Sequence, residues 1–197
     1  NGLGNETEKL WDVRHQAFHV ATSGRPGPVL VDIPKDVQFA SAEYAPPAKA
    51  TVSHYQPQVK GDMDTITELV EAIEKAERPI FYTGGGVINS GPAASQLLRE
   101  FVAATGFPIT STLMGLGAYP ASGENWIGML GMHGLYEANL AMHGCDLMIN
   151  IGARFDDRIT GRVQDFSPKS KKVHIDIDAS SINKVIHADV PIIGDVG

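Results

Sequence analysis

The sequence predicts an α/β fold with a doubly wound parallel sheet over residues 61–197. From Asp62 onward, short apolar stretches alternate with stretches of helical character, the pattern of a parallel sheet with helices on its faces. Residues 152–158 place a glycine and four charged residues directly after one apolar stretch, at the edge where such sheets bind ligands. With 43% hydrophobic and 20% charged residues, the chain can also build a substantial core.

The expected elements of this region follow in chain order. They are a helix at 62–76, a strand at 79–83, a glycine turn at 84–86, a helix at 92–105, a strand at 108–111, a helix at 135–143, a strand at 147–151, a strand at 172–177, a helix at 180–186 and a strand at 190–193. Short apolar runs favour the strands, and the glycines and prolines between the runs mark the turns. The five strands would form a Rossmann-like sheet.

The first 40 residues are typical of the end of a preceding unit. Residues 8–23 favour a helix, because apolar residues recur near a 3.6-residue period: Leu10, Val13, Ala17, Val20 and Ala21. Glycines and prolines in residues 24–28 end this helix, and residues 29–33 are predicted as a short buried strand. One helix and one strand cannot form a covered sheet alone. Residues 41–60 contain several alanines and prolines and are predicted as an extended linker.

The composition argues against several classes of partner. A net charge of −7, with no long run of Lys or Arg, argues against nucleic acid. No apolar stretch reaches the ~18 residues that span a bilayer and no signal peptide opens the chain, so no membrane partner is expected. The single cysteine, Cys145, fits a reducing compartment and is predicted to be a core residue rather than a nucleophile. The chain starts without Met, and we expect it to be a piece of a longer protein.

Residues 152–158, Gly-Ala-Arg-Phe-Asp-Asp-Arg, are the first candidate site. Arg154 and Arg158 suggest an anionic ligand, because a planar guanidinium matches the oxygens of phosphate and carboxylate groups. The alternative is a surface turn whose ion pairs satisfy each other. This segment alone favours neither interpretation.

Other predicted strand ends carry groups suited to a nucleotide. Residues 84–86 are glycines whose N–H groups could approach a phosphate, although the spacing departs from G-x-G-x-x-G and a tight turn is the alternative. Methionines in residues 111–117 and 128–134 suit a flat ring system, although any one of them could fill the core. Asp176 lies at the end of the strand expected at 172–177 and Asp195 follows the last strand, positions where a carboxylate commonly binds a ribose diol.

No reaction centre accompanies these groups. The sequence has no P-loop, no Ser, His and Asp in the order of a catalytic triad, no nucleophile elbow and no evident catalytic carboxylate pair. His133 has no second His, Asp or Glu at metal-ligand spacing. We therefore predict no catalytic and no metal-binding residue in this chain.

Five motifs together resemble one enzyme family. Residues 24–37 (GRPGPVLVDIPKDV), 112–117 (TLMGLG), 131–134 (GMHG), 152–158 (GARFDDR) and 174–178 (HIDID) stand in the order found in catalytic subunits of acetolactate (acetohydroxyacid) synthase, a thiamine-diphosphate enzyme. The resemblance runs from about Ala17 to the end, and residues 1–16 match the family poorly. The alternatives are a sister thiamine-diphosphate enzyme, such as glyoxylate carboligase or pyruvate oxidase, and a stand-alone nucleotide-binding module.

The resemblance implies a domain organisation and an activity. Residues 1–40 would be the tail of a pyrimidine-binding domain, residues 41–60 a linker and residues 61–197 a central domain that binds FAD. Thiamine diphosphate and Mg²⁺ would bind through domains outside this chain, so the fragment alone would be inactive. The whole enzyme would act on 2-keto acids in branched-chain amino acid biosynthesis. It would be a homo-oligomer with a small regulatory subunit, in the cytoplasm or, in a plant, the plastid.

The resemblance also implies individual site residues. The FAD contacts would be Arg25, Gly85, Gly86, Thr112, Leu113, Met114, Leu130, Gly131, Met132, His133, Gly134, Gly152, Arg154, Arg158, Asp176, Ile177, Asp195 and Val196. The substrate channel would be lined by Lys35, Met132, Asp157 and Arg158.

Overall fold

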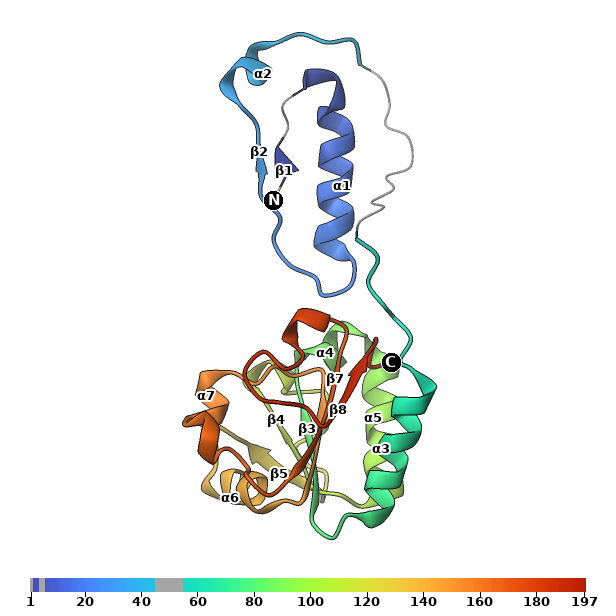
Figure 1. The fold of residues 1–197 in the computed structure, drawn as a ribbon, viewed down its shortest axis with the longest axis vertical. Helices are drawn as coiled ribbons and strands as arrows, with labels where there is room; N and C mark the ends of the chain where they lie inside the picture. Colours follow the sequence, from blue (N-terminus) through green and yellow to red (C-terminus); the bar gives the residue numbers. More distant parts are fainter. Residues whose placement is uncertain (1, 4–5, 45–54) are drawn as a thin grey trace. The chain divides into compact units, whose positions relative to one another are not determined.

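The chain folds into two compact units in a computed structural model that describes residues 2–3, 6–44 and 55–197. The first unit is Asn1–Pro57 and the second is Gln58–Gly197 (Figure 1). In the described part of the chain, no helix combines the length and the apolar character needed to span a membrane.

The second unit contains a sheet of six parallel strands in the order β5-β4-β3-β6-β7-β8. The strands are β3 (Pro79–Thr83), β4 (Ile109–Ser111), β5 (Trp126–Met129), β6 (Leu147–Ile151), β7 (Lys171–Asp176) and β8 (Val190–Ile193). Along the chain, β4 and β5 are added in turn on one side of β3, and β6, β7 and β8 are then added on its other side. This is the strand order of a Rossmann fold. The predicted doubly wound parallel sheet is confirmed.

The edge strand β5 makes six strands instead of the expected five. Gly128 lies inside it with a φ of +88°, and its register against β4 is irregular. Three of its four residues are only half buried, because an edge strand has a neighbour on one side only. Because Gly128 interrupts its apolar residues, β5 lacks the continuous apolar run by which buried strands are recognised in a sequence.

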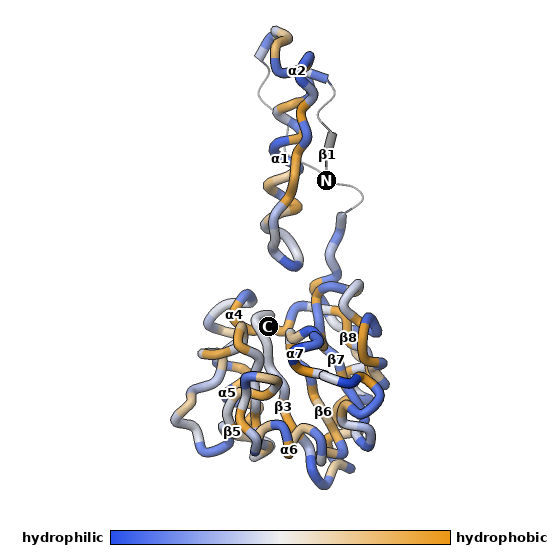
Figure 2. The backbone as a smooth tube through the Cα atoms, turned by 90° about the vertical axis from the view of Figure 1, so that its left-hand side faces the viewer, coloured by the Kyte–Doolittle hydropathy of each residue, from blue (hydrophilic) through white to orange (hydrophobic). Residues whose placement is uncertain are grey.

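Helices cover both faces of this sheet (Figure 1). α3 (Met63–Lys75) and α5 (Pro92–Thr105) pack on one face, where Leu69 and Leu98 join a core with Phe81. α6 (Tyr136–Gly144) packs on the other face, where Met142 joins a second core with Met148. Figure 2 shows hydrophobic segments along the central strands.

The main helices begin and end at residues that favour helix ends. The Asp62 carboxylate accepts the N–H of Thr65 at 3.0 Å and so caps α3. Pro92 opens α5, and Gly106 ends it with a φ of +71°. The short helices of the second unit are α4 (Gly85–Asn89), α7 (Asp157–Thr160) and the 3-10 turns η2 (Leu113–Gly115), η3 (Val163–Asp165) and η4 (Ala179–Ser181). The expected glycine turn at 84–86 is thus the start of α4.

The predicted helix at 180–186 is wrong, because only the turn η4 forms there. The Asp178 carboxylate accepts the N–H and the hydroxyl of Ser180, and Asn183 takes a φ of +58° while its side chain accepts the N–H of Ala188. These local bonds between side chains and backbone replace the hydrogen bonds of a helix.

The first unit consists of one longer helix and short elements. α1 (Leu10–Thr22) follows the turn η1 (Thr7–Lys9), and α2 (Lys35–Phe39) is a helix that was not expected from the sequence. The strand expected at 29–33 is reduced to β2 (Val31–Asp32), which pairs in parallel with β1 (Gly2–Leu3). Val37 is the only buried residue among the described residues of this unit. Of the expected linker, residues 45–54 lie outside the described residues.

Candidate functional site

The candidate site lies where the two halves of the sheet meet, at the carboxyl ends of β3 and β6. After β3 the chain builds β4 and β5 on one side, and from β6 it builds β7 and β8 on the other. In open α/β sheets the loops diverge at such a switch point and leave a crevice for a ligand. The segments that follow these strands carry most of the site residues expected from the sequence.

Glycines let the loops at the switch point pack closely. The N–H of Gly84 donates to the carbonyl of Ile151 at 3.0 Å, and that of Gly86 donates to the carbonyl of Gly152 at 2.9 Å. A Cβ on Gly86 would lie 2.6 Å from the Cα of Gly152, closer than two carbon atoms can approach. Because its N–H is already bonded within the protein, Gly86 holds the two loops together. A Cβ on Gly85 would lie 3.2 Å from the Cβ of Met114.

Residues 152–158, called the arginine segment, leave β6 through Gly152, whose φ is +62°. Arg154 lies 3.2 Å from a carboxylate oxygen of Asp156, and Arg158 lies 3.5 Å from one of Asp157. The arginines are thus paired as the surface-turn interpretation expects. However, their side chains are 55% and 65% exposed, and exposed pairs of this kind contribute little stability. An anion could replace the carboxylates at small cost.

Asp156 is also the N-cap residue of the short helix α7. Its carboxylate accepts the N–H of Arg158 at 3.3 Å. The neighbouring Asp157 side chain and the hydrogen bond from the Arg158 N–H, reinforced by the charges of Arg154 and Arg158, lower the pKa of Asp156. The segment therefore keeps a carboxylate beside the guanidinium of Arg154 at neutral pH.

Apolar side chains are exposed at the same edge of the sheet. Leu113 and Met114 follow β4 and are 68% and 75% exposed, and Met132 follows β5 and is 64% exposed. Thr112 fixes the turn that carries the first two, because its hydroxyl accepts the N–H of Gly115 and its own N–H donates to Thr83. Exposed apolar side chains clustered in loops commonly mark a binding surface.

The loop after β5 is tied to the end of the arginine segment. The Asn139 side chain accepts the N–H of Gly131 at 2.9 Å and donates to its carbonyl at 3.0 Å, and the N–H of Met132 donates to the carbonyl of Arg158 at 2.8 Å. Leu130 is buried in the core, whereas His133 is exposed. A Cβ on Gly134 would meet the backbone of residues 129–130. Sequence reasoning missed Asn139, whose only signal is its position on the helix after this loop.

The carboxyl ends of β7 and β8 complete the edge. Asp176 is 8% exposed and accepts the N–H of Asp178 at 2.9 Å, and Ile177 is half buried. Asp195 is exposed and accepts the hydroxyl of Ser90, the residue after α4, at 3.1 Å. Val196 packs against the core. The site residues expected in the second unit thus follow β3 to β8 at one edge of the sheet.

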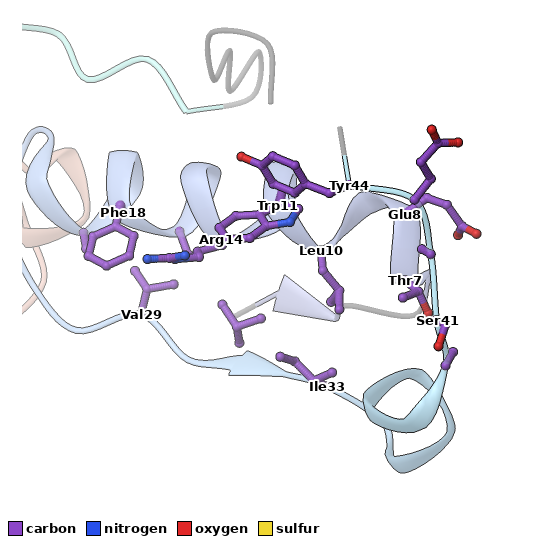
Figure 3. Close-up of a pocket in the computed structure, with 16 residues that line it drawn as sticks. Thr7, Glu8, Leu10, Trp11, Arg14, Phe18, Val29, Ile33, Ser41 and Tyr44 are labelled. Carbon is purple, nitrogen blue, oxygen red and sulfur yellow. The ribbon is translucent and has the colours of Figure 1, made fainter. Parts of the chain in front are cut away.

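Arg25 and Lys35 lie in the first unit and are both exposed. Arg25 follows α1, and the Nζ of Lys35 lies 6.0 Å from the ring centroid of Phe39. This unit has an apolar pocket of about 740 Å³, to which Trp11 and Phe18 of α1 contribute (Figure 3). None of the expected site residues lines it.

The opposite, amino-terminal edge of the sheet holds a second cavity of about 610 Å³, lined in part by Phe107 and Cys145. Cys145 is buried in the core, and burial raises the pKa of its thiol, which fits the predicted core role. Within residues 2–3, 6–44 and 55–197, no cluster of three His, Cys, Asp or Glu side chains could hold a metal ion.

The strand order defines a doubly wound α/β domain, a fold class whose ligands commonly bind at the switch point. Residues 66–197 match the family described as the thiamine pyrophosphate enzyme, central domain, and the chain belongs to this family.

Comparison with individual proteins agrees with the motif resemblance. The chain is 43% identical over 195 residues to acetolactate synthase isozyme 3 large subunit of Escherichia coli K12, covering 98% of this chain and 34% of that protein. It is 46% identical over 196 residues to an acetolactate synthase of Mycobacterium bovis, covering 100% of this chain and 31% of that protein. These two alignments include residues before Ala17, so the resemblance begins earlier than the motifs indicate. The chain spans about a third of the length of these curated relatives.

A solved structure agrees with the fold. It is described as a thiamin diphosphate-dependent enzyme from Mycobacterium smegmatis and has a TM-score of 0.78 to this chain at 23% identity. The likeness covers 99% of this chain and 37% of that one.

Proposed function

We propose that the chain is the central, FAD-binding part of an acetolactate synthase. The observation that carries the proposal is that two arginines, Arg154 and Arg158, and three apolar side chains, Leu113, Met114 and Met132, are exposed in segments that follow the strands at one edge of the sheet. Identities of 42–47% to curated acetolactate synthases support the choice of family member.

The residues at this edge fit the parts of FAD. FAD carries an anionic pyrophosphate, a flat ring system and a ribose diol. Arg154 and Arg158 would hold the anionic or ring portion, and Leu113, Met114 and Met132 would pack on the ring. Asp176 and Asp195, at the ends of β7 and β8, would hold the adenosine end. In this role FAD does no net redox chemistry and is held as a bound part of the site.

The proposed reaction belongs to the longer protein. Thiamine diphosphate and Mg²⁺ would bind through parts outside this chain, and the cofactor would supply the carbanion chemistry. The enzyme would decarboxylate pyruvate and join the remaining two-carbon unit to a second 2-keto acid, in branched-chain amino acid biosynthesis. Lys35, Met132, Asp157 and Arg158 would line the substrate channel, and this chain alone would have no activity. We also propose that the longer protein is a cytoplasmic homo-oligomer that binds a small regulatory subunit.

An FAD titration of the apoprotein tests the binding role. Arg154→Ala should weaken FAD binding about 10-fold or more, because hydrogen bonds to charged groups contribute ~1.5–3 kcal/mol. Arg162→Ala is the matched control, since Arg162 is also an exposed arginine and forms a similar local pair, 3.0 Å from Asp165, but has no assigned role. Tighter binding of NAD than of FAD by the parent protein would overturn the flavin assignment. In the intact enzyme, condensation of glyoxylate without acetolactate formation would favour a sister enzyme.

A further inference from the structure

A row of buried polar side chains crosses the sheet beneath the arginine segment. Thr110 on β4, Tyr82 on β3, Asn150 on β6 and His174 on β7 are direct neighbours in register. All four are 0% exposed. Because residues in register on parallel strands project from the same face of a sheet, their side chains form one continuous row. Four adjacent polar residues inside a core are costly unless each is hydrogen-bonded.

Three members of this row converge on the backbone of residues 153–154. The Asn150 side chain donates to the carbonyl of Ala153 at 2.8 Å and accepts its N–H at 3.1 Å. The Nε2 of His174 lies 3.0 Å from the same carbonyl. The Tyr82 hydroxyl donates to the carbonyl of Arg154 at 3.1 Å. Thr110 differs, because its hydroxyl donates to the carbonyl of Gly128.

Aromatic packing fixes the next residue of the segment. The Phe155 ring lies 5.1 Å from the His174 ring, edge to face, and 5.9 Å from the Tyr82 ring. Ala153 and Phe155 are 3% and 5% exposed, whereas the Arg154 side chain between them is 55% exposed. Residues 153–155 are therefore held from below on both sides of Arg154, and among these three residues only the arginine side chain projects outward.

The Tyr82 hydroxyl is suited to this task. Burial, reinforced by the charge of Asp156, raises the pKa of Tyr82 well above its usual range, so the hydroxyl remains a donor at working pH. An apolar row would be the simpler way to stabilise a core, and in some proteins buried polar groups specify one arrangement of the chain. In this chain the arrangement that they specify is that of residues 153–155.

We infer that Tyr82, Asn150 and His174 are positioning residues of the ligand site, which act through the backbone of residues 153–154 to set the direction of the Arg154 guanidinium. The inference rests on the proposed flavin site. It assigns a role to three residues that lie below the site and whose side chains are closed to solvent.

A double-mutant cycle on FAD affinity tests the inference in the intact protein. Tyr82→Phe keeps the ring and removes one hydrogen bond, so it should weaken FAD binding about fivefold, the contribution of one ordinary hydrogen bond. In the Arg154→Ala background the same substitution should change the affinity by less than about twofold, because its effect passes through Arg154. Ser167→Ala is the control: it removes another buried hydroxyl, which donates to Met142 at 2.7 Å near Cys145, and should leave FAD affinity unchanged.

The outcomes separate the inference from the proposed function. If the parent protein binds no FAD, the proposed function fails and the inference fails with it. If the parent binds FAD and Tyr82→Phe binds it equally well, or loses the same factor with and without Arg154, only the inference is overturned. Amide hydrogen exchange without FAD gives a second readout. Asn150→Ala should accelerate exchange at Ala153 more than at Val173 in the neighbouring strand, and an equal acceleration at both would contradict positioning.

Discussion

At the scale of single residues, two buried threonines separate the cost of burying a hydroxyl from the benefit of its hydrogen bond. Thr83 and Thr110 lie on neighbouring strands, and both are 0% exposed. The Thr110 hydroxyl donates to the carbonyl of Gly128 at 2.7 Å. The Thr83 hydroxyl has no hydrogen-bond partner within the described residues. The two sites therefore differ in pairing but not in burial.

We expect Val to have opposite effects at these two sites. Thr83→Val removes an unpaired polar group and should leave the free energy of unfolding unchanged or raise it by up to ~1 kcal/mol. Thr110→Val leaves the Gly128 carbonyl unpaired and should lower it by ~1–3 kcal/mol. Urea unfolding of both variants measures the difference. Equal destabilisation by the two substitutions would contradict this assignment of hydrogen bonds.

Residue by residue, the sequence indicates the candidate ligand groups more readily than the groups that hold them. Arg154 and Asp176 are predictable because charges and carboxylates at strand ends suggest ligands. Asn150 gives a weaker signal, a single amide inside the apolar run 147–151. Asn150 lies beside Tyr82 and His174 because of the register of three parallel strands. A single sequence does not specify this register.

At the scale of elements, glycine decides how closely the loop after β3 approaches the loop after β6. A Cβ on Gly86 would lie 2.6 Å from the Cα of Gly152. Gly144 ends α6 without a positive φ, and a Cβ there would have nothing within 4 Å. Substitution by Ala would therefore create a backbone clash at Gly86 but not at Gly144.

Gly86→Ala should lower the free energy of unfolding by ~1–3 kcal/mol or more, because one backbone must move away from the other. Gly144→Ala should raise it by ~0.4–1 kcal/mol, since it only restricts the unfolded chain. Thermal unfolding of both variants, with FAD affinity measured beside it, tests the pair. A Gly86→Ala variant as stable as the parent would show that the two loops do not need this contact.

Element by element, the predictions hold where the apolar pattern is continuous and fail where local polar bonds or a sheet edge interrupt it. The strands at 79–83 and 147–151 are correct to the residue, because each is buried on both faces. The helix expected at 180–186 fails because Asp178 and Asn183 bond to nearby backbone instead. The edge strand β5 escapes notice because Gly128 interrupts it.

At the scale of the whole chain, the two units differ in how much each buries. The second unit has a core on each face of its sheet, whereas α1 in the first unit has no buried residue and lines an apolar pocket of about 740 Å³. α1 and α5 have 13 and 14 residues, but only α5 buries side chains, Ala94, Leu98 and Val102. Helices of this length are marginal in water without packing.

Amide hydrogen exchange of the 197-residue chain should therefore separate these two helices of similar length. Amides of α5 should exchange as slowly as those of β3 and β6, because they open only when the second unit unfolds. Amides of α1 should exchange faster by at least about 100-fold, since local unfolding of α1 exposes little buried surface. Protection of α1 equal to that of α5 would mean that the first unit has a stability of its own, which its exposed apolar side chains do not explain.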